Sequence, residues 1–374
     1  MFSSLFGAAN KDIHPHWQHQ EIRIDSSESA LRLVPGETLV RTFPNVQDKK
    51  GSNGEDGSLT VTTLRLIWRS KRNRRGNLSI GHDCIYLLSS TPEHSVVHGR
   101  NELLHVEAKF AGTRFEFVFR APTQHTQEGG CGGDAAGSLA AVAGRLHTSF
   151  VETRIYRDLR VKSAIVTDGE LDLLEFETVH AQIQGVVNVS SDKGVLGRIV
   201  FTNIRTVWFS TLTGSSNISL PYLQIASVKV TQSKYGPAIA IETYGTRVTG
   251  SYRLGFQIPG EGVGKLKEVA SFVQAARKNY MECPVFGVQF EDSVVEKGKL
   301  DGRGSQATLT EDESLFVDGE EAGMVQESDE CHRDLFETYA QDGSGEVEFV
   351  YDENLGLAVA RPKGSHLTSL DVWP

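Results

Sequence analysis

Polar and apolar positions alternate along most of the first third of the chain. The stretch LTVTTL at 59–64 places its side chains on two opposite faces, as in a half-buried β-strand. A tight turn at Thr63-Leu64 then leads into a second strand of the same hairpin. Turn-rich sequence separates these two strands from the others that the pattern predicts, at 37–43, 77–80, 84–89, 102–109 and 113–120.

After these strands the period changes from two residues to between three and four. Leu139, Val142, Leu146 and Phe150 follow the spacing of an apolar stripe on an amphipathic helix. The same order then recurs: we expect a helix that carries Leu266, Val269 and Val273, preceded by strands near 176–180, 197–202, 204–210, 216–220, 224–231, 238–243 and 251–258.

The recurrence is an internal repeat of domain size. Residues 57–70 read GSLTVTTLRLIWRS and residues 197–210 read GRIVFTNIRTVWFS, so Gly, Thr, Arg, Trp and Ser recur at a shift of 140. The motifs NLSI at 77 and NISL at 217 keep this register, as do Glu37-Thr38 and Glu177-Thr178. Such a repeat indicates a duplication, and its length favours two similar modules over a solenoid.

Seven strands followed by one helix, twice, predict a mainly β fold. We interpret each copy as a pleckstrin-homology-like domain, a seven-stranded bent sheet or barrel capped by its C-terminal helix. The predicted organisation is a flexible arm over 1–20, a first domain over 21–159, a second over 160–282 and an extension over 283–374. Within the extension we expect disorder over 291–345 and a docking segment over 346–373.

Charge and cysteine content narrow the class of protein. The net charge of −10 resides in residues 291–330, which hold thirteen acids and three bases, so the repeats are neutral overall. Four scattered cysteines argue against a disulfide or zinc framework. The N-terminus does not resemble a signal peptide, and no apolar run reaches the roughly 20 residues that span a bilayer. We therefore expect a soluble, intracellular protein.

The repeated motifs resemble the paired repeat of the Bardet–Biedl syndrome 5 protein family. The resemblance also covers RFEFVF at 114–119, YRDLRVKSAIV at 156–166, SSDKGVLG at 190–197, SKYGPAIAIE at 233–242, PVFGV at 284–288 and ENLGLAV at 353–359. These matches keep their order over nearly the whole chain. They exclude residues 1–20, the insert at 121–137 and the acidic segment.

The resemblance, rather than composition or spacing, carries the functional expectations. It implies two pleckstrin-homology-like domains in a non-enzymatic adaptor subunit of the BBSome, which moves membrane proteins in cilia and flagella. It further implies binding of phosphatidylinositol 3-phosphate, a link to intraflagellar transport, and location in the cytoplasm, cilium or flagellum and basal body as a peripheral membrane protein. The implied partners are other BBSome subunits and, through the complex, a small Arf-like GTPase.

A phosphoinositide site needs several lysines or arginines on adjacent loops, because these side chains form charge-assisted hydrogen bonds with phosphate. In this fold the loops after the first, third and sixth strands share one rim. If they converge here, they form a lipid-binding site that consists of Lys49, Lys50, Lys71, Arg72, Arg74, Arg75 and Arg114.

Two other interpretations of this basic sequence remain open. The run KRNRR at 71–75 is also compatible with a solvated loop that protects a strand edge, or with a contact to an acidic neighbouring subunit. The second copy lacks the run and reads TLTGSS at 211–216, and only Lys193 and Arg247 remain on its rim. We therefore expect any lipid site to lie in the first domain. The main alternative is a structural scaffold that does not bind lipid.

Other functions find little support in the sequence. Arg65 and Arg205 recur beside a repeated tryptophan, so we interpret them as structural residues with buried stems and locally paired heads. The stretch PGEGVGKL at 259–266 lacks the first glycine and the final Ser or Thr of a phosphate-binding loop. A neutral body beside an acidic segment opposes nucleic-acid binding. The histidines of HPHWQH at 14–19 are expected in a solvated tail, so no catalytic residue, metal or cofactor is predicted.

Overall fold

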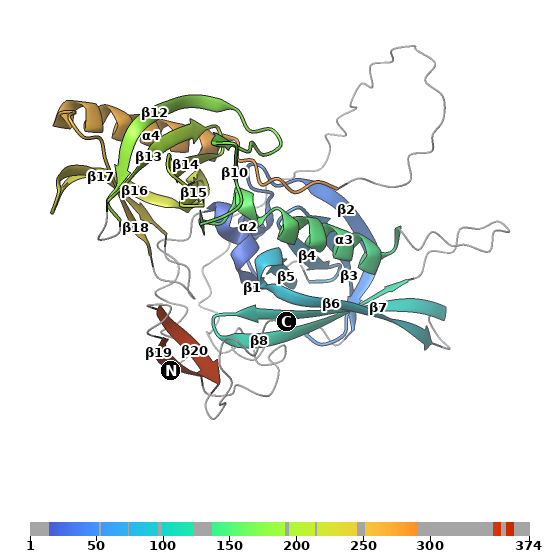
Figure 1. Cartoon of the computed structure of the whole chain (residues 1–374). Helices are drawn as coiled ribbons and strands as arrows, with labels where there is room; N and C mark the ends of the chain where they lie inside the picture. Colours follow the sequence, from blue (N-terminus) through green and yellow to red (C-terminus); the bar gives the residue numbers. More distant parts are fainter. Residues whose placement is uncertain are drawn as a thin grey trace, which may run out of the picture.

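The computed structural model describes residues 15–51, 54–73, 75–95, 99–122, 137–190, 194–213, 215–244, 251–290, 347–352 and 357–362. Two antiparallel sheets of eight strands each form the body of the molecule, and each is followed by one long helix (Figure 1). Neither sheet closes into a barrel, because the first and last strands of each order do not pair. The two pleckstrin-homology-like domains predicted from the repeat are therefore confirmed as open, bent sheets.

The first sheet has the strand order β1-β5-β4-β3-β2-β8-β7-β6. Its strands are β1 Ile22–Ile24, β2 Leu39–Asp48, β3 Glu55–Thr62, β4 Arg65–Ser70, β5 Asn77–Gly81, β6 Ile85–Ser95, β7 Gly99–Phe110 and β8 Thr113–Pro122. The short elements beside it are η1 Pro15–Gln20, α2 Glu28–Leu31 and η2 His82–Cys84, and the sheet is followed by α3 Leu139–Glu152 and η4 Arg154–Tyr156.

The second sheet repeats this plan in the order β16-β17-β18-β12-β13-β14-β15-β9. Its strands are β9 Arg160–Val161, β12 Val179–Asn188, β13 Val195–Thr202, β14 Arg205–Ser210, β15 Asn217–Pro221, β16 Ile225–Ser233, β17 Gly236–Thr243 and β18 Arg253–Gln257. The hairpin of β10 Val166–Thr167 and β11 Glu170–Leu171, the short η5 Tyr222–Gln224 and the helix α4 Val263–Glu282 complete the domain.

The repeated sequence forms the same hairpin in both sheets. Gly57 pairs with Ser70 across β3 and β4, and Gly197 pairs with Ser210 across β13 and β14. The prediction of seven strands is one short for each eight-stranded sheet, and it also missed the β10–β11 hairpin. The strands that it missed in the two sheets, β1 and β9, have three and two residues. Segments of this length are too short to show a period of two.

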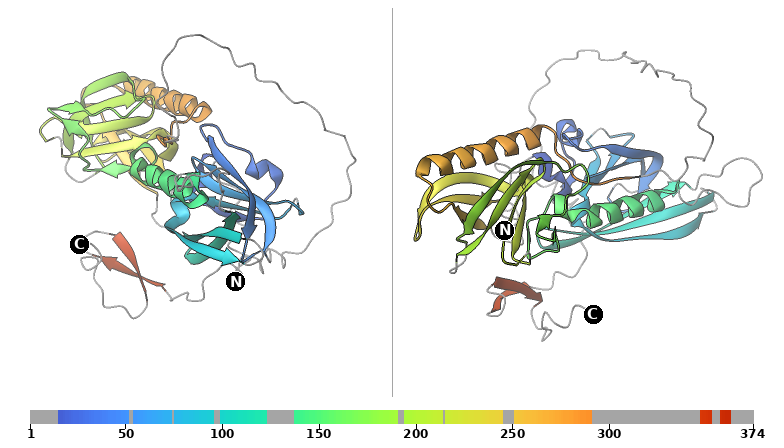
Figure 2. Two further views of the ribbon diagram at one scale, coloured as in Figure 1. Left: turned by 90° about the vertical axis from the view of Figure 1, so that its right-hand side faces the viewer. Right: turned by 45° about the horizontal axis from the view of Figure 1, so that its top comes forward.

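The predicted apolar stripes of the two helices are confirmed. In α3, Leu139, Val142 and Leu146 are buried in the core of the first domain. Phe150, one turn further on, packs instead in a core cluster made mostly of second-domain residues. The helix therefore lies at the junction of the two domains (Figure 2). In α4, the three predicted residues Leu266, Val269 and Val273 are all buried in the second domain.

Residues 283–290, which we call the strap, follow α4 and connect the two domains. Phe286 is 3% exposed and belongs to the second-domain cluster, whereas Phe290 packs against the first-domain cluster and Val288 contacts both. Arg157 donates a hydrogen bond of 2.8 Å to the carbonyl oxygen of Phe286. The strap therefore packs against the cores of both domains.

The predicted flexible arm is wrong for its last six residues. Residues 15–20 form η1, in which Gln18 and His19 are buried. The carbonyl oxygen of His19 lies only 2.3 Å from where a Cβ on residue 81 would stand, so Gly81 permits this close approach. Residues 1–14 and the predicted disordered segment 291–345 lie outside the described residues. In the extension, β19 Val347–Asp352 pairs with β20 Leu357–Pro362, and docking of this segment stays a prediction.

Candidate functional site

The loops after β2 and β4 lie at the same end of the first sheet. The backbone N–H of Lys71 donates 2.9 Å to the carbonyl of Asp56, which joins the loop after β4 to the start of β3. The backbone N–H of Lys49 donates 2.9 Å to Val118 of β8. The strand pairing thus brings the first two predicted loops to one rim of the first domain.

Polar side chains bind the described backbone of residues 71–76, a segment that we call the basic loop. Ser70 Oγ accepts hydrogen bonds of 3.0 and 2.9 Å from the N–H groups of Arg72 and Asn73, and Asn73 Oδ1 accepts one of 3.0 Å from Arg75. With its backbone fixed in this way, the loop holds the side chains of Lys71, Arg72 and Arg75 exposed to solvent. Arg74 of the predicted site lies outside the described residues.

Two of the predicted cations form ion pairs with neighbouring strands. Lys49 Nζ lies 3.1 Å from Glu93 of β6, and Lys50 Nζ lies 2.5 Å from Glu116 of β8. Arg120 also binds Glu93 and, followed by Lys49, lowers the pKa of this carboxyl to about 2. Lys50 likewise lowers the pKa of Glu116. Both carboxylates are therefore ionised at neutral pH and offset the charges of Lys49 and Lys50.

Lys71 and Arg114 differ in their surroundings. The Lys71 ammonium donates to the neutral amide oxygen of Asn45, a contact that brings no counter-charge. Arg114 lies opposite Lys109 in the backbone register of the β7–β8 hairpin. Its positive charge acts to lower the pKa of Tyr86, against the larger effect of burial. In the sheet order, β3 and β2 separate β8 from β4. The convergence of all seven residues stays a prediction, and the described part of the basic loop contributes Lys71, Arg72 and Arg75.

The equivalent loop of the second domain keeps the backbone pattern without the charge. Ser210 Oγ accepts hydrogen bonds of 3.2 and 3.4 Å from Leu212 and Thr213, as Ser70 does in the first domain. Leu212 is 84% exposed at the position that Arg72 holds in the first domain. The remaining cations predicted for this rim, Lys193 and Arg247, lie outside the described residues.

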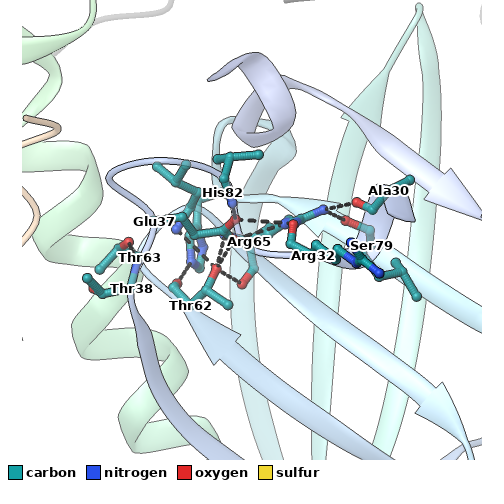
Figure 3. A network of polar contacts seen from close by, with 12 residues as sticks. Ala30, Arg32, Glu37, Thr38, Thr62, Thr63, Arg65, Ser79 and His82 are labelled. Carbon is teal, nitrogen blue, oxygen red and sulfur yellow. Dashed lines mark hydrogen bonds and ion pairs between the residues drawn. The ribbon is translucent and has the colours of Figure 1, made fainter. Parts of the chain in front are cut away.

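Arg65 has the structural role that its recurrence predicted (Figure 3). Its side chain and that of Glu37 are 0% exposed, and the two form an ion pair with an Nε–Oε1 distance of 2.9 Å. Thr62 Oγ1 donates 2.7 Å to the same carboxylate, and the guanidinium also donates to the backbone carbonyls of Ala30 and Arg32. With its charge neutralised and its donors occupied, Arg65 is not available to a ligand.

Arg205 repeats this arrangement in the second domain. It lies 2.8 Å from Glu177, and Thr202 Oγ1 donates 2.8 Å to that carboxylate. The sequence predicted local pairing but did not identify the partners. The available signal was the recurrence of Glu37 and Glu177 in the same register.

The residues that the structure describes contain no group of three or more histidine, cysteine or acidic side chains that could hold a metal ion. None of the helices among them is long and apolar enough to cross a membrane.

Two open antiparallel sheets, each followed by a helix, define a protein with tandem pleckstrin-homology-like domains. Residues 37–130 match the family model of the Bardet-Biedl syndrome 5 protein N-terminal PH-like domain. Residues 160–290 match the model of the second PH-like domain of the same protein. Both copies of the repeat therefore match one family, in the order that the family has them.

Curated relatives agree with the family models over almost the whole chain. The mouse (Mus musculus) "BBSome complex member BBS5" is 36% identical over 364 residues, which cover 96% of this chain and 97% of that protein. The human (Homo sapiens) relative of the same description is 34% identical over the same shares of both chains. The Caenorhabditis elegans "BBSome complex member bbs-5" is 33% identical and covers 96% of each chain. The chain belongs to the Bardet–Biedl syndrome 5 protein family, a family of non-enzymatic scaffolds and adaptors.

Proposed function

We propose that this chain is a subunit of a BBSome and acts as an adaptor in the trafficking of ciliary or flagellar membrane proteins. Relatives described as BBSome complex members match it over 96% of its length, which supports a shared assembly. The further associations that the family resemblance implies are part of this proposal: intraflagellar transport, the basal body and cytoplasm as locations, peripheral attachment to the membrane, and a small Arf-like GTPase reached through the complex.

Within this role, we propose that the basic loop of the first domain binds phosphoinositide headgroups, with phosphatidylinositol 3-phosphate as the candidate lipid. The observation that carries the proposal is the asymmetry between two loops with the same backbone pattern. The loop after β4 exposes Lys71, Arg72 and Arg75, whereas the loop after β14 carries no lysine or arginine. A duplicated scaffold that exposes three described cations on one loop gains affinity for clustered phosphates.

The charge of the loop sets the scale of the affinity. Each lysine or arginine near an anionic leaflet contributes about 1 kcal/mol. The four cations of the loop thus contribute roughly 4 kcal/mol, which corresponds to weak binding. Such a site serves a subunit that is held at the membrane together with other membrane-binding contacts of its complex.

The alternative function is a structural scaffold without lipid binding. The ion pairs of Lys49 with Glu93 and of Lys50 with Glu116 favour it, because they remove two cations from the predicted site. In that case the basic loop contacts an acidic surface of another subunit.

Co-sedimentation with liposomes separates these two functions. The full chain is compared with a variant in which Lys71, Arg72, Arg74 and Arg75 are changed to Ser, with and without phosphatidylinositol 3-phosphate, at low and physiological salt. A matched control loses four exposed second-domain lysines: Lys229, Lys234, Lys267 and Lys278. We expect headgroup-dependent binding by the parent and the control and not by the loop variant. Equal binding by all three proteins, or by none, contradicts the lipid site.

A further inference from the structure

One turn precedes the first long strand of each domain, at residues 34–37 in the first domain and 174–177 in the second, and the two turns have the same hydrogen bonds. In the first domain, Val34 N–H donates 3.0 Å to the carboxylate of Glu37, whose own N–H donates 2.9 Å to the carbonyl of Val34. In the second, Leu174 and Glu177 exchange the same two hydrogen bonds, of 2.7 and 3.0 Å. The carboxylates are those that bind the buried arginines, so the core network fixes the shape of both turns.

The third residue of each turn has a left-handed backbone, which favours glycine. Gly36 meets this requirement with φ +77°, as the Pro-Gly pair of a tight turn does. The second domain holds Phe176 at the same position with φ +62°. A bulky residue with positive φ is a strained outlier, and such outliers concentrate at functional sites.

The strap covers the first of these turns. A Cβ on Gly36 would stand 2.4 Å from the carbonyl oxygen of Pro284 and 2.9 Å from the ring of Phe286. The glycine thus leaves room for an apolar segment that packs directly on the turn. At the equivalent place on the second domain the Phe176 side chain projects outward, and it is 65% exposed.

The strained phenylalanine lies among other exposed apolar side chains and carboxylates. Leu173 is 51% exposed and Val179 is 48% exposed, three positions to either side of Phe176. Residues 166–180 hold five acids and neither lysine nor arginine. Four of these acids are exposed: Asp168, Glu170, Asp172 and Glu175. Glu170 forms an ion pair of 2.9 Å with Arg198, and the other three exposed carboxylates leave the surface acidic. Such a surface repels an anionic membrane, whereas an apolar protein segment with basic neighbours complements it.

We propose that the surface of Leu173, Phe176 and Val179 is a docking site for an apolar, basic-flanked segment of a neighbouring protein subunit, with Phe176 as its anchor. The occupant is inferred from the first domain, where an apolar segment already packs on the equivalent turn. An aromatic anchor inserted into a partner is the usual centre of a protein interface. The inference rests on the proposed membership of a multisubunit complex and identifies the surface that such a complex uses.

Phe176→Gly tests the anchor, because glycine suits the backbone at this position. The full chain, affinity-tagged, is co-expressed with the other BBSome subunits, and the stoichiometry of the co-purified subunits is measured. We expect Phe176→Gly to raise the Tm of the isolated chain by about 2 °C or more and to weaken assembly by at least about tenfold. Phe176→Asn, which also tolerates a left-handed backbone, should lose assembly likewise. As a matched control, Leu212→Ser removes a more exposed apolar side chain elsewhere and should assemble normally.

The outcomes separate this inference from the proposed function. If the parent chain does not assemble with other BBSome subunits, the proposed function is wrong. If the parent and Phe176→Gly assemble equally, the docking site is wrong while the proposed function stands.

A photo-crosslinking residue, p-benzoylphenylalanine, placed at position 176 of the assembled complex identifies the occupant. A crosslink to another subunit supports the proposal. A crosslink within the chain, a crosslink between two copies, or a loss of liposome binding by Phe176→Gly would each assign the surface to a different occupant and overturn it.

Discussion

Glu37 in the first domain and Glu177 in the second bind their buried arginines with almost the same geometry, at 2.9 and 2.8 Å. The repeated tryptophan is fixed in the same way in each copy. Trp68 Nε1 donates 2.9 Å to Val46, and Trp208 Nε1 donates 3.0 Å to Val186. Loss of either partner of a buried ion pair leaves an uncompensated charge, so a substitution of one partner alone destabilises the fold. This physical constraint accounts for a buried ion pair that is the same in both copies.

The outer surfaces of the two domains are built differently. In the first domain the short helix α2 contributes the buried Leu31. In the second domain, Val166 and Leu171 of the β10–β11 hairpin pack against a cluster that contains Val207 and Phe209. The loops after β4 and β14 differ in charge, and the turns before β2 and β12 differ at Gly36 and Phe176. The two copies thus differ at these surface positions, whereas the buried Glu–Arg–Thr network is the same in both.

The largest predicted effect comes from breaking the shared core. Glu37→Ala leaves the Arg65 guanidinium buried without its counter-charge, which costs about 3–5 kcal/mol of unfolding free energy. Glu177→Ala should cost a similar amount in the second domain. Hydrogen exchange measured peptide by peptide reports the two domains separately and should show the loss confined to the mutated one.

A double replacement distinguishes lost charge pairing from lost packing. Glu37→Leu combined with Arg65→Met removes both charges and should recover most of the stability that Glu37→Ala loses. If hydrogen exchange of Glu37→Ala equals that of the parent, the buried ion pair does not contribute to the stability of the first domain.

The next effect concerns the glycines that face the repeated tryptophans. A Cβ at Gly57 would stand 2.4 Å from the carbonyl oxygen of Arg69, and one at Gly197 would stand 2.2 Å from that of Phe209. Backbone atoms do not yield easily, so Gly57→Ala and Gly197→Ala should each cost about 1–3 kcal/mol. Thermal unfolding measures the cost. The control Gly144→Ala adds a methyl group to α3 where nothing lies within 4 Å, and it should stabilise the chain.

Much of the core was predictable because its signals lie close together in the sequence. The shift of 140 identified the hairpin of residues 57–70, and the helical spacing of Leu139 and Phe150 identified α3. The basic site was less predictable. Lys49 and Lys50 find their carboxylates 44 and 66 residues further along the chain, through strand pairings that no local pattern encodes.

The stabilities of the two domains should also depend differently on pH. At equivalent positions, His82 Nε2 lies 3.0 Å from the carbonyl oxygen of Thr62, and the Tyr222 hydroxyl donates 2.9 Å to that of Thr202. Burial lowers the pKa of His82 to about 3 and raises the pKa of Tyr222 to about 12. The unfolded histidine takes up a proton below its ordinary pKa of 6.5 while the folded one does not. His82 therefore makes the first domain lose stability as the pH falls from 6.5 toward 3.

The second domain has the opposite dependence at this position. Unfolded Tyr222 releases its proton above pH 10 while the folded residue keeps it, so stability falls between pH 10 and 12. Domain-resolved hydrogen exchange, corrected for the intrinsic exchange rate, measures the loss of stability at acid pH in the first domain and at alkaline pH in the second. His82→Tyr should reduce the loss of stability of the first domain between pH 6.5 and 4.5, where His147 contributes the rest because burial also lowers its pKa. Below pH 4.5, Glu93 and Glu116 add their own loss, because their pKa values are lowered in the folded domain. If His82→Tyr loses as much stability at acid pH as the parent does, His82 is not the cause of that loss.

The smallest predicted effect is on lipid binding by the paired lysines. Lys49→Ala and Lys50→Ala remove cations that Glu93 and Glu116 already offset, so each should change liposome affinity by less than about twofold. Lys71→Ser combined with Arg72→Ser should reduce it by about tenfold or more. A larger loss from the Lys49 or Lys50 variant would mean that these ion pairs open at the membrane.

The most direct test of the difference between the two domains is hydrogen exchange of the full chain with liposomes that contain phosphatidylinositol 3-phosphate. The account predicts slower exchange in residues 71–76 of the first domain and unchanged exchange in residues 211–216 of the second. Liposomes without the phosphoinositide should leave both loops unchanged. Slower exchange in the second-domain loop, or none in the basic loop although the chain is bound, would contradict the assignment of lipid binding to the first domain.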